Sequence, residues 1–252
     1  MYLVEYNVRT PFGVRNRVPC PSMELWERVE KSARRTRVAL SYPRIARAGV
    51  EIADREGLDA VSMRRVAKQL EAGAMSLYRY VESRDELIEL MADHAYTEFP
   101  AAPRSGDWRA DLAEAARRIR RTTLKHPWLA GQSVPRTGLG PNLLRMMEST
   151  LALVDGYGLH IDQMLDLLLT MQAFVNGYVL NEITERDAQH RTGANAQQAQ
   201  ERHIPRVRQV IASGQFPLLA RVVTESEDNP DPDLAFERRL HYVLNGLAWA
   251  FT

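Results

Sequence analysis

Apolar side chains recur at α-helical spacing, almost without interruption, from Ser41 to the end of the 252-residue chain. Residues three and four positions apart share one face of a helix, whereas strand residues alternate at every second position. No alternating run of β-branched residues is long enough to compete with this pattern. The sequence therefore predicts an all-α fold, in which helix faces and the turns between helices carry the function.

Composition excludes several kinds of protein. The single cysteine, Cys20, cannot form an intramolecular disulfide, and no cysteine or histidine residues have the spacing of a zinc site. No Ser/His/Asp set, phosphate-binding glycine loop or close carboxylate pair points to catalysis. We expect no metal ion, no cofactor and no enzymatic activity.

The chain also lacks the signals of export and of membrane insertion. It has no uninterrupted apolar run of about 18 residues. Its first residues include charges and prolines where a secretory signal would be apolar. We expect a soluble, cytoplasmic protein with no membrane partner.

Charge is unevenly distributed, although its sum is small. The formal net charge is +1, from 33 Lys and Arg residues against 32 Asp and Glu residues. Positions 31–37 hold only cations among their charged residues, whereas acids gather in positions 225–233. This asymmetry indicates a basic amino-terminal head on a more acidic body.

Residues 1–37 are predicted to form a flexible basic extension, because prolines and a glycine interrupt any periodicity before position 22. Within it, Met23 is a candidate for the natural start of the chain. The cations from Lys31 to Arg37 are placed to lie in a narrow minor groove of DNA. The alternative is a solvated run of charge with no partner.

The stretch from Ser41 to Val81 predicts three helices joined by tight turns. Ser41 and Ser62 are placed to cap the first and second helices, and Gly57 supplies a left-handed stop between them. A turn at residues 71–73 leads to a short third helix that ends at Val81. The order of elements is that of a helix-turn-helix.

The second and third of these helices have the composition of a DNA-reading element. Small or flexible residues from Gly73 to Ser76 let the third helix approach base edges in a major groove about 12 Å wide. Arg64 is placed to contact a guanine, and the hydroxyls of Tyr78 and Tyr80 to contact phosphates. The predicted DNA-binding residues are Ser62, Met63, Arg64, Gly73, Ala74, Met75, Ser76, Tyr78, Arg79, Tyr80 and Arg84.

Several strings of residues carry a specific resemblance. In the first third of the chain they are Gly57-Leu58-Asp59-Ala60-Val61-Ser62, Arg65-Val66-Ala67 and Ala74-Met75-Ser76-Leu77-Tyr78-Arg79-Tyr80-Val81. These look like the DNA-binding domain of the tetracycline-repressor (TetR) family. Later strings resemble the effector-binding domain of the same family: Trp108-Arg109-Ala110-Asp111-Leu112, His126-Pro127-Trp128-Leu129 and Phe174-Val175-Asn176-Gly177-Tyr178.

The resemblance implies both a domain organisation and a function. It implies an N-terminal three-helix helix-turn-helix domain over residues 38–99 and a larger helical ligand-binding and dimerisation domain over residues 100–252. It further implies a ligand-responsive transcriptional repressor. Such a protein binds a palindromic operator in double-stranded DNA as a homodimer, and a small-molecule effector releases it.

One residue departs from the family pattern. Glu71 stands where the family usually has glycine after the second helix. A left-handed backbone at this position would cost about 1 kcal/mol for a residue with a side chain. A locally different turn is the alternative.

The remainder of the chain predicts longer helices near residues 107–125, 141–155, 160–185, 196–213 and 232–251. The helices at 160–185 and 232–251 are apolar on two faces, so each needs its own core and a second body to cover it. A two-fold related copy of the same surface is the simplest cover. We therefore expect these two helices to form a four-helix bundle between two subunits.

An effector pocket in the larger domain is implied by the resemblance alone. Its predicted lining is Ile119, Thr123, Trp128, Met147, Thr150, Leu151, Met171 and Phe174. Each of these side chains, taken singly, fits an ordinary core better than a pocket. The alternative for the whole protein is a helical ligand-binding or scaffold protein that has lost operator binding, for which Glu71 is the hint.

Overall fold

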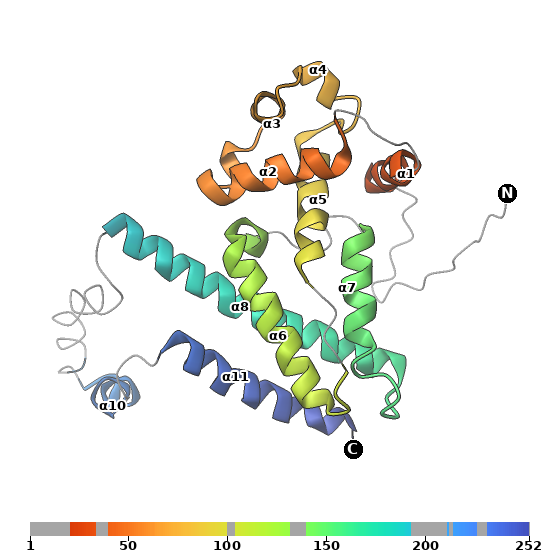
Figure 1. Ribbon diagram of the computed structural model, residues 1–252. Coiled ribbons are helices and arrows are strands. Elements are labelled where there is room, and N and C mark those ends of the chain that lie inside the picture. Colours follow the sequence, from red (N-terminus) through yellow and green to blue (C-terminus); the bar gives the residue numbers. More distant parts are fainter. Residues whose placement is uncertain are drawn as a thin grey trace.

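The computed structural model describes residues 21–33, 40–99, 104–131, 140–192, 211, 214–225 and 231–251. Within these ranges the regular structure is helical and no strand occurs, which confirms the all-α prediction (Figure 1). The α-helices are α1 (Pro21–Ala33), α2 (Tyr42–Glu56), α3 (Met63–Gln69), α4 (Ala74–Leu77), α5 (Arg84–Ala95), α6 (Trp108–Lys125), α7 (Pro141–Leu151), α8 (Ile161–Thr192), α10 (Pro217–Glu225) and α11 (Pro232–Leu247).

The N-terminal unit consists of α2, α3, α4 and α5 around one hydrophobic core. Ile45, Val66, Leu77 and Leu87 are fully buried there. Figure 1 shows α3 and α4 at the end of the molecule away from α6, α8 and α11, while α5 runs from that end toward the larger unit. The helix-turn-helix is thus presented at one tip of the molecule.

Side-chain caps fix the starts of α3 and α5, whereas Ser41, which was predicted to cap α2, makes no side-chain cap bond. The Ser62 hydroxyl accepts the Arg65 N–H, and the Ser83 hydroxyl accepts the Glu86 N–H. The Glu86 carboxylate accepts the Glu82 N–H at 2.8 Å, so Ser83 and Glu86 form a capping box that closes one residue earlier than its usual form. These bonds satisfy helix N–H groups that have no partner within the helix.

The larger unit packs α6, α8 and α11 around a second core. Met171, Val175 and Phe236 are fully buried in it. α6 crosses both α8 and α11 in Figure 1, and α7 packs against α5 and α8. α7 is therefore the helix of the larger unit that lies beside the connecting helix α5.

The prediction of a flexible extension was wrong for residues 21–33, which form α1. Pro21 is the first residue of this helix, a position where a missing N–H costs nothing. Leu25 and Trp26 are buried in the first core, and Arg28 pairs with Glu86 at 2.7 Å. The remaining residues of the predicted extension, including Arg34, Arg35 and Arg37, lie outside the described residues.

Helix bounds in the rest of the chain differ from the predicted ones at α4, α7 and α8. α4 ends at Leu77, and residues 78–80 continue as a turn. α7 ends before residue 155, and α8 continues past residue 185. The helix predicted at 196–213 lies outside the described residues except for Ile211.

One helix, α10, was not predicted. None of its residues is buried, and its apolar side chains Leu218, Leu219, Val222 and Val223 are exposed.

Among the described helices, none is both long enough and apolar enough to cross a membrane.

Candidate DNA-binding surface and ligand cavities

The turn between α3 and α4 places Glu71 in the left-handed region, with φ 53°. The Ala72 N–H donates to the Ala67 carbonyl at 2.9 Å, and the Glu71 N–H donates to the Lys68 carbonyl at 3.2 Å. This pair of bonds is the Schellman helix end, which favours glycine at the position of Glu71. Of the two alternatives left by the sequence, the strained backbone holds, at a cost of about 1 kcal/mol.

α4 presents its first turn to solvent. Met75 is 78% exposed and Tyr78 is 46% exposed, whereas Leu77 is fully buried. Ala74 and Ser76 are half-buried on either side of Met75. Leu77 therefore anchors a helix whose tip, at Met75, projects outward.

Exposed cations belong to the same segment. Arg64, Lys68 and Arg79 are exposed, and no ion pair joins them to any residue that the structure describes. Arg65, by contrast, is bonded to Glu56 of α2. The unpaired guanidinium and ammonium groups are free to meet phosphate oxygens.

Two of the predicted DNA-binding side chains are turned inward. Met63 is buried in the N-terminal core, because it shares the α3 face of Val66 and Ala67. The Tyr80 hydroxyl donates to the Leu40 carbonyl at 2.9 Å, so its one donor is already used. The prediction of DNA contact was wrong for Met63, and wrong for Tyr80 as a phosphate donor.

The Arg84 side chain makes two hydrogen bonds to backbone carbonyls of the same unit. Its Nε donates to the Val61 carbonyl at 3.0 Å, and its Nη2 donates to the Leu58 carbonyl at 2.8 Å. These bonds hold the segment before α3 against the first turn of α5. These bonds give Arg84 a role in positioning the helix-turn-helix, and contact of this exposed side chain with DNA stays a prediction.

Two small cavities lie among α6, α7 and α8, with volumes of about 20 and about 30 Å³. Phe99, Ile119 and Met146 line both of them. Polar side chains complete the walls: Ser149 and Thr150 in one cavity, and Thr123, Gln172 and Asn176 in the other. Ile119, Thr123 and Thr150 are therefore the predicted pocket residues that the structure brings together.

Trp128 lies elsewhere, in the N-terminal core. Its indole N–H donates to the Asp54 carboxylate at 2.8 Å, and Nδ1 of the buried His126 lies 2.8 Å from the same carboxylate oxygen. Asp54 belongs to α2, so the turn after α6 fastens the larger unit to the N-terminal unit. The prediction that Trp128 lines the effector pocket was wrong, because its indole makes this contact between the two units.

Other predicted pocket residues lie close to the cavities without lining them. Met171 is fully buried in the second core, and Leu151 is partly buried against it. Met147 stands next to the residue that does line both cavities, Met146. Adjacent residues of a helix point about 100° apart, so a one-residue error in register changes the wall of a cavity.

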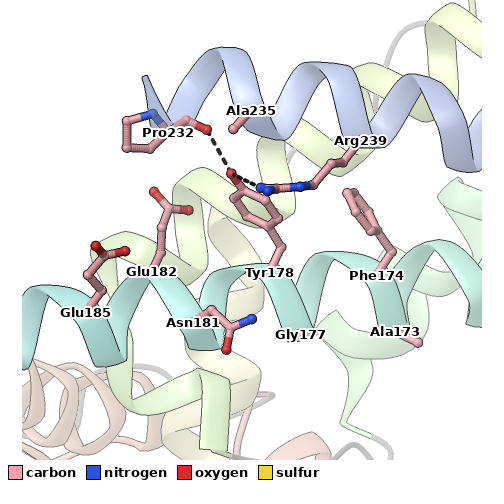
Figure 2. A pocket seen from close by; sticks show the side chains of 10 residues that line it. All are labelled: Ala173, Phe174, Gly177, Tyr178, Asn181, Glu182, Glu185, Pro232, Ala235 and Arg239. Carbon is pink, nitrogen blue, oxygen red and sulfur yellow. Dashed lines mark hydrogen bonds between the residues drawn. The ribbon is translucent and has the colours of Figure 1, made fainter. Parts of the chain in front are cut away.

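A larger cavity of about 570 Å³ lies between α8 and α11, as Figure 2 shows. The Tyr178 hydroxyl donates to the Pro232 carbonyl at 3.0 Å and accepts a bond from Arg239 at 3.3 Å. Its lining comprises Ala173, Phe174, Gly177, Tyr178, Asn181, Glu182, Glu185, Pro232, Ala235 and Arg239. Of these, the sequence singled out only Phe174 for a pocket, and the structure moves it to this cavity.

Arg120 ties the three helices of the larger unit together. It pairs with Glu182 of α8 at 2.8 Å and with Asp233 of α11 at 2.6 Å. Hydrogen bonding to Glu182, against the opposing effect of burial, raises the pKa of the Arg120 guanidinium. These bonds fix α8 and α11 beside the cavity between them.

Comparison with known proteins covers nearly the whole chain. The model of bacterial regulatory proteins of the tetR family matches residues 45–91, and that of the tetracyclin repressor-like C-terminal domain matches residues 99–250. The HTH-type transcriptional repressor DrrR1 of Streptomyces coeruleorubidus is 35% identical over 226 residues, which are 88% of this chain and 83% of that protein.

Two further relatives extend the comparison. The tetracycline repressor protein class A from transposon 1721 of Escherichia coli is 27% identical, over 81% of this chain and 88% of its own. The solved structure of ActR from Streptomyces coelicolor in complex with actinorhodin is 32% identical, with a TM-score of 0.71 over 84% of this chain and 98% of its own. The chain belongs to the TetR family of bacterial transcriptional regulators.

Proposed function

We propose that the protein represses transcription by binding a palindromic operator as a homodimer, and that a small-molecule effector in the larger unit releases it. The observation that carries this proposal is the exposed tip of α4, where Met75 projects from a helix anchored by buried Leu77. The site of action is the cytoplasm, where the operator DNA lies, and no catalytic step is part of the proposal.

The DNA contacts divide into base contacts and phosphate contacts. Met75 and Ala74 meet thymine methyl groups in the major groove, and Arg64 meets a guanine. Ser62, Tyr78 and Arg79 are exposed donors for phosphates, which set position and do not read sequence. Gly73 and Ser76 let the backbone of α4 come close to the base edges.

A second copy of the chain is the proposed cover for the outer faces of α8 and α11. Leu165, Leu169 and Leu180 are exposed along α8, and Leu234 and Tyr242 along α11. Spacings of four and eleven residues along α8, and of eight residues along α11, place the members on one face of each helix. The cavity between α8 and α11 includes exposed residues of α8, Ala173, Gly177 and Asn181, in its lining, so the same partner would also cover it.

The effector site is proposed at the two cavities among α6, α7 and α8. Ligand pockets usually measure about 300–1,000 Å³, far more than either cavity has here. Phe99 and Met146 separate the two cavities, so movement of these side chains would join them. Aromatic and amide walls favour a ligand with flat apolar rings and hydrogen-bonding groups, and ActR, a relative with a bound actinorhodin, supports this proposal.

The test is fluorescence anisotropy with duplexes from the DNA beside the protein's own gene, between about 50 and about 200 mM salt. We expect one duplex to bind at least about 1,000-fold more tightly than its scrambled form. We expect actinorhodin, used as the probe, to weaken that binding. Arg64→Ala should weaken it by about 2 kcal/mol, whereas the matched control Arg186→Ala, an exposed arginine on α8, should not.

A result of equal affinity for specific and scrambled duplexes would contradict the proposal. It would instead support the ligand-binding or scaffold protein without an operator, for which the strained backbone at Glu71 is the structural argument. Loss of affinity with Arg186→Ala to the same degree as with Arg64→Ala would show that the affinity reflects overall charge alone.

A further inference from the structure

Asp93 of α5 caps the N-terminus of α7. Its Oδ1 accepts the backbone N–H of Asn142 at 2.9 Å and that of Leu143 at 3.1 Å, and its Oδ2 accepts the Asn142 side-chain amide at 2.7 Å. Helices usually take such a cap from their own N-cap residue, but here that residue is Gly140, which has no side chain. α7 therefore depends on a different helix for its cap.

The contact leaves no free space. A Cβ at Gly140 would lie 2.2 Å from Asp93 Oδ1 and 2.7 Å from Trp26 Cζ2 of α1. Asp93 itself is only 5% exposed. Interiors packed this closely transmit displacement instead of absorbing it. We call Asp93, Gly140, Asn142 and Leu143 the Asp93 joint.

α7 connects this joint to the proposed effector site. Its later residues Met146, Ser149 and Thr150 line the two cavities, and its first residues form the joint. A helix of 11 residues is a rod about 16 Å long. Displacement of the cavity wall therefore moves the N-terminus of α7.

α5 connects the joint to the DNA-binding unit. Asp93 lies in the last turn of α5, and Arg84 is its first residue. Arg84 holds the carbonyls of Leu58 and Val61, just before α3 begins. One helix thus links the Asp93 joint to the segment that positions the helix-turn-helix.

We propose that Asp93 is the positioning residue that transmits the state of the cavities to the DNA-binding unit, an inference that rests on the function proposed above. It acts through α7 on one side and α5 on the other, and it touches neither DNA nor effector. Removal of the joint should leave DNA binding and the cavities in place while breaking the dependence of one on the other.

The test uses a large side chain in the cavity wall in place of an effector. Thr150→Phe adds volume beside Met146 and displaces α7, because tightly packed sites do not accept extra atoms without shifting. Affinity for the tightest duplex selected from a random library is measured by anisotropy, with and without Thr150→Phe. The readout is the ratio of the two dissociation constants, which loss of stability alone does not change.

In the parent chain Thr150→Phe should weaken DNA binding by about tenfold. In chains that also carry Asp93→Ser or Gly140→Ala the ratio should fall below about twofold. The first variant replaces the carboxylate by a hydroxyl that is one bond shorter and so draws the acceptor back, and the second pushes the acceptor away, so they break the joint by independent routes. Asp93→Asn keeps one acceptor oxygen for the backbone N–H groups and should restore most of the ratio.

Asp111→Ser is the matched control. Asp111 is a second buried aspartate, and both its carboxylate oxygens accept the Ser105 N–H at 3.0 Å, away from the joint. This variant should lose stability yet keep the tenfold ratio.

Three results would contradict the inference. An equal ratio in the parent, Asp93→Ser and Gly140→Ala chains would show that the joint transmits nothing. A ratio lost in Asp111→Ser as well would show a general effect of stability. A parent chain indifferent to Thr150→Phe, and to Ser149→Phe as a second filler, would overturn control by the cavities and thus the proposed function itself.

Discussion

The DNA-binding surface and the ligand cavities are built in different ways. The cap at Ser62, the turn at Glu71 and the projecting Met75 all lie within one contiguous stretch of the chain. The cavities take their walls from the segment that follows α5, from α6, from α7 and from α8. A surface made by one short stretch is encoded locally, whereas a cavity depends on the register of helices that meet only in the folded state.

The largest expected effect tests whether the larger unit controls the DNA-binding unit through dimerisation. Leu169→Arg places a charge on the exposed face of α8, where Leu169 is 54% exposed. A buried unpaired charge opposes association, so we expect monomers in analytical ultracentrifugation. Operator affinity should then fall by about 1,000-fold, toward the nonspecific level. A dimer of unchanged affinity would place the interface elsewhere.

Met75→Asp tests the DNA-binding unit alone. A carboxylate at the tip of α4 would face phosphates and base acceptors, so we expect operator binding to lose about 2 kcal/mol. Because the side chain is exposed, the melting temperature and the dimer should not change. Operator titration and thermal unfolding on the same sample measure both quantities, and parallel loss of the two would show that Met75 supports the fold.

Glu89→Gln tests the helix that joins the two regions. Burial, with Glu86 and Asp85 nearby, raises the pKa of Glu89 to about 7, and its Oε2 is buried without a partner. Because the pKa of Glu89 is higher in the folded chain than in the unfolded chain, the fold favours the protonated carboxyl. The contribution of Glu89 to the free energy of unfolding is therefore fully present below pH 4.5 and is lost as the pH rises through 7. With allowance for its partial exposure, Glu89→Gln should gain about 1 kcal/mol at pH 8 and little at pH 5. Denaturant unfolding at both pH values measures this, and an equal gain at both would exclude titration as the cause.

Glu71→Gly should have an effect as small as that of Glu89→Gln, and it concerns the turn of the DNA-binding unit. Glycine adopts the observed φ of 53° without strain, so the free energy of unfolding should rise by about 1 kcal/mol. The melting temperature should rise by about 3 °C. Glu71→Ala is the control, because it removes the charge and keeps the strained backbone. A gain with alanine equal to that with glycine would assign the cost to charge instead.

The difference between locally encoded features and features set by tertiary packing explains which parts of the structure the sequence predicted. The all-α class and α2 follow from the apolar spacing, and α3 and the start of α4 follow from the Ser62 cap and from turn residues that act over a few positions. The hydrogen bonds of Tyr80 and Arg84 to backbone carbonyls do not follow from such local signals. Their partners, Leu40, Val61 and Leu58, are brought into place by tertiary packing. A tyrosine or an arginine looks the same in the sequence whether its side chain binds a DNA phosphate or a backbone carbonyl.

Two other features were out of reach for related reasons. α1 was missed because prolines and glycine suggested an irregular segment, although Leu25, Trp26 and Val29 have the spacing of one helix face. Met147 was predicted in place of Met146 because the apolar pattern of α7 fits both residues until its neighbours are known. The Asp93 joint has no local signal at all, since its aspartate and its glycine are 47 residues apart.

Dimethyl sulfate protection of the operator tests the central claim most directly, because the reagent reports guanine N7 in the major groove and adenine N3 in the minor groove. We predict two clusters of protected guanine N7 atoms about one helical turn apart, one for each copy of α4. Arg64→Ala should expose one guanine in each cluster. Protection confined to adenine N3, or a single cluster of guanines, would contradict entry of α4 into successive major grooves.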